Sequence, residues 1–129
     1  MIRIAQILSA LFVLVLGSAG LTTIFSPMTI LEPSGFEVAS NYGITNLRTL
    51  GAPTLALAII TVIAIIRKEW LLVLPASAYF FLNFSARIVS VFAEGYESTM
   101  LFGILLTFTL FVLSQIALHT FRRAELVTA

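Results

Sequence analysis

Four long apolar segments constrain the fold of this chain more than any other feature of its sequence. They cover roughly residues 4–25, 47–66, 70–93 and 99–121, and each approaches the ~20 apolar residues that a helix needs to cross ~30 Å of hydrocarbon. Hydrophobic residues make up 60% of the chain and charged residues 10%, a composition foreign to soluble domains of this size. The sequence therefore predicts an all-α fold, a four-helix transmembrane bundle, with residues 1–129 as a single membrane domain.

The first segment also resembles a secretory signal, because Arg3 precedes an apolar run that ends in small residues. The run continues past Leu21 to Ile24 and Phe25, which is longer than the apolar core of a typical signal. We therefore expect a helix that is retained in the protein. The longest connection, about residues 26–46, is expected to be an extracytoplasmic loop.

The charged residues are divided unequally between the two sides that four spans define. One side holds five basic and two acidic residues: Arg3, Arg67, Lys68, Glu69, Arg122, Arg123 and Glu125. The other side holds four glutamates and two arginines: Glu32, Glu37, Glu94, Glu97, Arg48 and Arg87. By the positive-inside rule the first side is cytoplasmic, so both termini are expected in the cytoplasm. Trp70, beside the basic turn, is expected to anchor the chain at the membrane interface.

The residues that carry most cofactor and metal chemistry are scarce. Cysteine is absent, which excludes disulfides, iron–sulfur clusters and thiol catalysis. His119 is the single histidine, and it is expected at the membrane face opposite Glu94 and Glu97, so these groups cannot form a conventional acid–base pair. We therefore expect no catalytic residues, no metal and no cofactor. His119 itself is expected to face solvent or lipid phosphate beside Arg122.

A polar stripe in the third apolar segment is the most unusual feature of the membrane-spanning part. Tyr79, Asn83, Arg87, Ser90 and Glu94 follow one another at steps of three or four residues, which places them on one face of a helix. An ionised guanidinium left in hydrocarbon costs roughly 3 kcal/mol or more. The stripe must therefore face protein, water or a ligand.

The start of the second spanning helix is also unusual. Pro53 lies about two turns after Asn46, a plausible helix cap, so the helix either begins at Pro53 or begins near Asn46 and is kinked. A kinked or broken start is favoured, because ~14 residues from Pro53 would span only ~21 Å. Arg48 would lie in the first turn, where the helix dipole does not favour a cation. A glutamate or an anionic ligand is therefore expected beside it.

Arg48 and Arg87 both belong to the outer half of the membrane, and we expect them to converge on one polar pocket. Two converging cations favour binding of an anion. The alternative is that Arg87 reaches the outer headgroups or forms a structural ion pair, and both interpretations remain open. The candidate ligand-binding residues are Arg48, Arg87, Asn83, Ser90, Glu94, Asn46 and Tyr79.

Three short stretches carry a resemblance to a known family: Asn46-Leu-Arg-Thr-Leu-Gly51, Arg87-Ile-Val-Ser90 and Glu94-Gly95. Together they resemble an uncharacterised bacterial family of four-span membrane proteins, a domain of unknown function, over nearly the whole chain. That family has an asparagine-x-arginine start to its second helix and a glycine-arginine-x-x-serine pattern before an aspartate-glycine pair. Here Ala86 replaces the glycine and Glu94 the aspartate. The resemblance implies a multi-pass protein of the bacterial inner (plasma) membrane.

A fainter likeness, through Arg48-Thr49-x-Gly51 and the polar third helix, is to the small four-helix scaffold proteins of ergosterol biosynthesis. Neither family supplies a reaction, and a shared helix count does not transfer a function.

The leading hypothesis is a non-enzymatic membrane protein that binds a lipid-like or anionic amphiphile, or a partner membrane protein, through the outer polar pocket. Membrane lipids, a second copy of the chain or a larger membrane complex are the expected partners. A small-solute transporter is the first alternative, although the chain lacks the glutamate that small multidrug exporters carry in their first helix. An accessory subunit of a membrane enzyme complex is the second. Nucleic acid is not expected as a partner, since there is no basic domain.

Overall fold

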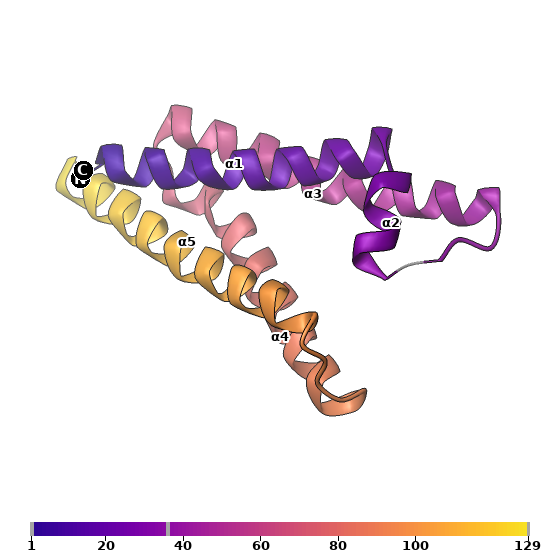
Figure 1. Ribbon diagram of the computed structural model, residues 1–129. Helices are drawn as coiled ribbons and strands as arrows, with labels where there is room; N and C mark the ends of the chain where they lie inside the picture. Colours follow the sequence, from indigo (N-terminus) through magenta and orange to yellow (C-terminus); the bar gives the residue numbers. More distant parts are fainter. Residues whose placement is uncertain (1, 36, 129) are drawn as a thin grey trace.

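The computed structural model describes residues 2–35 and 37–128, apart from the side chains of Glu32 and Thr128. The described part is helical and contains no strand (Figure 1). Its helices are α1 (Ile2–Phe25), α2 (Met28–Ser34), α3 (Asn41–Arg67), the 3-10 turn η1 (Trp70–Leu72), α4 (Leu74–Ala93) and α5 (Met100–Thr128). Four helical stretches are long and apolar enough to cross a membrane: Ile2–Phe25, Asn41–Arg67, Trp70–Glu94 and Met100–Val127. The expected four-helix membrane fold is confirmed.

The helices form two antiparallel pairs, α1 with α3 and α4 with α5. The pairs lie together where both chain ends are found, and α1 also contacts α5 there (Figure 1). Toward the opposite end the α1–α3 pair and the α4–α5 pair diverge as two arms. We call the end with both chain termini the terminal end and the opposite end the far end. The far end carries α2 and the connections between helices α1 and α3 and between helices α4 and α5.

The apolar core lies where the two pairs meet. Phe12 and Phe80 are buried and their rings contact edge to face, with centroids 5.5 Å apart. Val73 and Phe121 are buried in the same cluster. Lipid tails are as apolar as these side chains, so removal of apolar surface from water does not drive the helices together. Dispersion contacts and close packing stabilise their association instead.

Polar side chains also connect the helices within this core. Ser77 of α4 accepts hydrogen bonds from Ser114 Oγ at 2.9 Å and from Gln115 Nε2 at 2.7 Å, both from α5. On the other pair, Gln6 Nε2 of α1 donates to the Ile65 carbonyl of α3 at 3.2 Å. Such bonds between membrane helices contribute roughly 0.6–2 kcal/mol each. Both pairs are therefore joined by hydrogen bonds as well as by packing.

Helix α3 differs from the expectation at its start. It begins at Asn41, and its cap is Ser40, whose Oγ accepts from the Gly43 amide at 3.3 Å. The expected cap at Asn46 is wrong, because Ser40 provides the oxygen that pairs a free amide of the first turn. The helix is continuous through Pro53, so it begins before this proline, as expected, and is not broken at it. Residues 26–46 are likewise not a plain loop, since they contain α2 and the first turns of α3.

Glycine permits the closest approach between α1 and α3. A Cβ placed on Gly51 would lie 2.7 Å from the Gly20 carbonyl oxygen and 2.9 Å from Cγ1 of Ile24. A Cβ on Gly20 would lie 2.9 Å from the Leu55 amide nitrogen. Real Cβ atoms do not make such contacts with backbone, so the crossing needs glycine on both helices.

Replacement of Gly51 by alanine should therefore loosen the α1–α3 pair. We expect Gly51→Ala to lower the free energy of unfolding in detergent by about 1–3 kcal/mol, because the backbones must separate to accept the methyl group. Gly17→Ala is the matched control, since its Cβ would meet only the Ala58 Cβ at 3.8 Å. Both substitutions gain the same helix propensity, so equal stabilities for the two variants would contradict the close-packed crossing.

Candidate functional site

Three members of the polar stripe on α4 form one hydrogen-bonded chain. Arg87 Nε donates to Asn83 Oδ1 at 2.8 Å, and Asn83 Nδ2 donates to the Tyr79 hydroxyl at a longer 3.4 Å. Each residue lies one helical turn from the next, which is the spacing at which side chains on a helix meet. Because both ends of the Asn83 amide are engaged, its oxygen is directed at Arg87 and orients the guanidinium.

The facing helix α5 completes this arrangement with a residue that has no side chain. A Cβ on Gly103 would collide with Nη1 of Arg87 and would lie 2.8 Å from its Cζ. The guanidinium therefore lies directly against the α5 backbone at Gly103. Sequence analysis missed Gly103, since its role depends on the register between α4 and α5, which no local pattern in either helix reveals.

The charge of Arg87 is not neutralised by any described carboxylate. Its side chain is exposed, and the Asn83 contact is its one hydrogen bond among the described residues. Glu94 ends α4 with its backbone amide bonded to the Ser90 carbonyl at 2.9 Å, and its side chain is also exposed. Ser90 and Glu94 therefore share the α4 face with Arg87 without binding it. The two terminal nitrogens of the guanidinium are left for groups outside the described chain.

Arg48 has a different environment. It lies seven residues after the start of α3, beyond the first turn in which it was expected, and its side chain is exposed. Its Nη1 donates to the carbonyl of Ile24, in the last turn of α1. Carbonyls at this end of a helix lack an intrahelical donor and carry the negative end of the dipole, so a cation there is favourable. The α1 end, rather than a glutamate, accounts for this arginine.

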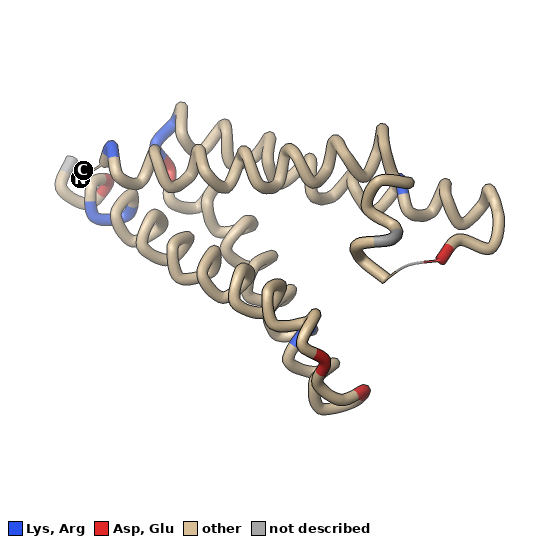
Figure 2. Tube along the Cα trace, viewed as in Figure 1, with Lys and Arg blue, Asp and Glu red and all other residues tan. Residues whose placement is uncertain are grey.

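The two arginines do not meet. Arg48 belongs to the α1–α3 arm and Arg87 to the α4–α5 arm, and Figure 2 shows cationic positions on each arm toward the far end. The expected single pocket is thus replaced by two separate environments, because the arms diverge. Asn46 remains with Arg48 on α3, where it lines a cavity of about 460 Å³ that Glu37 also lines. The side chain of Glu32, another expected counter-charge, lies outside the described residues.

No protein-family model, curated protein or solved structure matches this chain. The resemblance to the four-span bacterial family therefore rests on the sequence motifs alone. What the structure establishes is a multi-pass membrane protein with a four-helix bundle.

The contact of Arg48 with the α1 end predicts a structural role. We expect Arg48→Ala to lower the free energy of unfolding in detergent by about 1 kcal/mol, because the last carbonyls of α1 lose their cation. Asn46→Ala is the control, since Asn46 is an exposed neighbour whose side chain makes no hydrogen bond to described residues. An Arg48→Ala variant as stable as Asn46→Ala would show that the α1 end does not depend on Arg48.

Proposed function

We propose that this protein is a non-enzymatic membrane protein that binds an anionic amphiphile, with the anionic headgroup at Arg87. The observation that carries this proposal is an arginine held in place by Asn83 and Gly103 without a counter-ion among the described residues. A guanidinium offers two parallel N–H groups to carboxylate or phosphate oxygens. Nε is engaged by Asn83, and the terminal nitrogens have no hydrogen-bond acceptor among the described residues, so they are the donors for the ligand.

The depth of Arg87 suits a ligand with an apolar tail. It lies six residues before the end of α4 at Ala93, or roughly 9 Å below the helix end at 1.5 Å per residue. An anion at this depth would have its charged group near the membrane surface and its tail deeper along the α4–α5 pair, where the exposed Phe108 of α5 packs against Phe84, three residues before Arg87 on α4. A small soluble anion would gain the charge contact alone, so an amphiphile is favoured.

The orientation in the membrane follows from the charge asymmetry. The terminal end carries most of the basic residues, so we propose that it faces the cytoplasm and that Arg87 lies in the outer leaflet of a bacterial inner membrane. In this orientation the ligand reaches Arg87 laterally from the outer leaflet. Membership of the four-span bacterial family is part of the same proposal.

A transporter receives less support from the same contacts. Arg87 is the one charged residue within the described span of α4, and Arg48 is engaged by the α1 end. A proton-coupled cycle would have to use Glu94, which is exposed at the end of α4. We therefore propose binding without translocation.

Quenching of a local tryptophan by brominated lipid tests the proposal. Trp70, the single tryptophan, is replaced by phenylalanine, and Phe102→Trp places a reporter next to Gly103 at an exposed position. The protein is then reconstituted in phosphatidylcholine vesicles that contain brominated phosphatidylglycerol or brominated phosphatidylcholine. We expect stronger quenching by the anionic lipid. Arg87→Gln should lower the binding constant of phosphatidylglycerol relative to phosphatidylcholine about five-fold, because one interfacial cation contributes about 1 kcal/mol.

Two further variants separate a defined site from mere attraction of headgroups. Gly103→Ala retains the charge but displaces the guanidinium, so it should weaken the preference for the anionic lipid nearly as much as Arg87→Gln. Arg48→Gln removes a cation from the other arm, so the lipid preference that the tryptophan of Phe102→Trp reports should be unchanged. Full preference in Gly103→Ala, or an equal loss in Arg48→Gln, would overturn the proposed site.

A further inference from the structure

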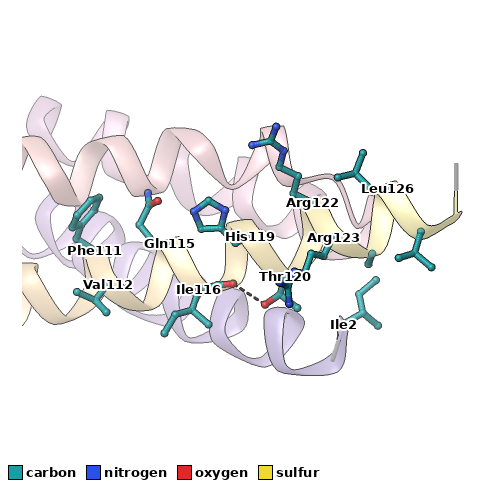
Figure 3. A pocket seen from close by; sticks show the side chains of 12 residues that line it. Ile2, Phe111, Val112, Gln115, Ile116, His119, Thr120, Arg122, Arg123 and Leu126 are labelled. Atoms are coloured by element: carbon teal, nitrogen blue, oxygen red, sulfur yellow. Dashed lines mark hydrogen bonds between the residues drawn. The ribbon is translucent and has the colours of Figure 1, made fainter.

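A groove of about 990 Å³ runs along the exposed side of α5 at the terminal end. Figure 3 shows its lining, which comes from α5 together with Ile2 of α1. Val112 and Ile116 line the part of the groove that is farther from the C-terminal end of α5. His119 and Arg123 follow on the same helix face, at steps of three and four residues. Along these four positions the groove passes from apolar side chains to His119 and Arg123, and Leu126 and Val127 line it beyond them.

The basic residues of this groove are not equivalent. Arg122 lies over the ring of Trp70, with 5.1 Å between its Cζ and the ring centroid, which is a cation–π contact. His119 and Arg123 are exposed and have no hydrogen-bond or ion-pair partner among the described residues. The Thr120 hydroxyl between them donates to the Ile116 carbonyl at 2.7 Å. His119 and Arg123 are thus the donors that remain for a ligand.

The order of these groups matches that of a phospholipid. Val112 and Arg123 are separated by eleven residues, which is roughly 16 Å along a helix, close to the ~15 Å depth of one leaflet. An acyl chain lying along Val112 and Ile116 would therefore place its headgroup phosphate at the level of His119 and Arg123. Glu125, the acidic residue nearest in sequence, does not line the groove, so the groove presents positive charge to that phosphate.

We propose that this groove binds one anionic phospholipid of the leaflet at the terminal end, with its phosphate between His119 and Arg123. Charge complementarity with Arg123 and the step from apolar to basic side chains favour this occupant over an apolar protein helix, which would leave the Arg123 charge without an acceptor. The site lies at the opposite end of the molecule from Arg87 and shares no residue with it. The proposal for the groove is therefore independent of the proposed function.

Trp70 serves as a natural reporter for this site, because it is the single tryptophan and contacts Arg122 at the edge of the groove. The full chain is reconstituted in phosphatidylcholine vesicles, and quenching of Trp70 by brominated phosphatidylglycerol is compared with quenching by brominated phosphatidylcholine. We expect the anionic lipid to be preferred, and Arg123→Gln to lower that preference about five-fold. Arg123→Lys, which retains the charge, should retain most of it.

Arg3→Gln is the matched control, since it removes a cation from the same end outside the groove. We expect this variant to keep the preference of the unmodified chain. Equal quenching by the two lipids in the unmodified chain would overturn the proposal. An Arg3→Gln loss as large as that of Arg123→Gln would also overturn it, because the preference would then reflect general surface charge. A loss confined to Arg123→Gln and His119→Gln supports the groove.

Discussion

The absence of water from the hydrocarbon region is the constraint on which the rest of this structure depends. Every backbone amide and carbonyl at membrane depth must be paired within the protein, which leaves helices as the solution for these four apolar segments. Hydroxyl groups obey the same requirement. The hydroxyls of Thr61 and Thr120 each donate to the carbonyl oxygen of the residue four positions earlier, at 2.7 Å. Neither hydroxyl is therefore an unpaired donor. Among the buried hydroxyl groups of the described residues, Ser9 is the exception, since its Oγ has no hydrogen-bond partner there.

The same constraint makes the two membrane-embedded arginines informative. Arg48 and Arg87 are both exposed, and both lie about two helical turns from the far end. They differ in the groups that their guanidinium nitrogens bind. Arg48 is used within the fold, where it caps the carbonyl end of α1. Arg87 is oriented by Asn83 and Gly103, but its charge has no described counterpart. This difference in partners, rather than burial or position along the chain, separates a structural arginine from a candidate site.

Much of this architecture could be predicted, and the failures have specific causes. The four spans, the placement of both termini at one end and the neighbouring positions of Asn83 and Arg87 follow from hydropathy and helical periodicity. The start of α3 differs from the prediction because Asn46 and Ser40 are both good caps, and the sequence alone does not decide between them. The convergence of Arg48 and Arg87 was inferred from equal depth, which carries no information about which helices pair.

The sequence by itself determined the number of spans, the class of protein and the polar face of α4, since these depend on side-chain hydropathy and on the fixed period of the helix. Tertiary structure decided that α1 pairs with α3, that α4 pairs with α5 and that the two arms diverge. Those features depend on contacts between helices: backbones approach closely at Gly20 and Gly51 in one arm, and the Arg87 side chain lies against Gly103 in the other. A glycine shows its role only when its neighbour across the interface is known, and so the environment of Arg87 required the structure.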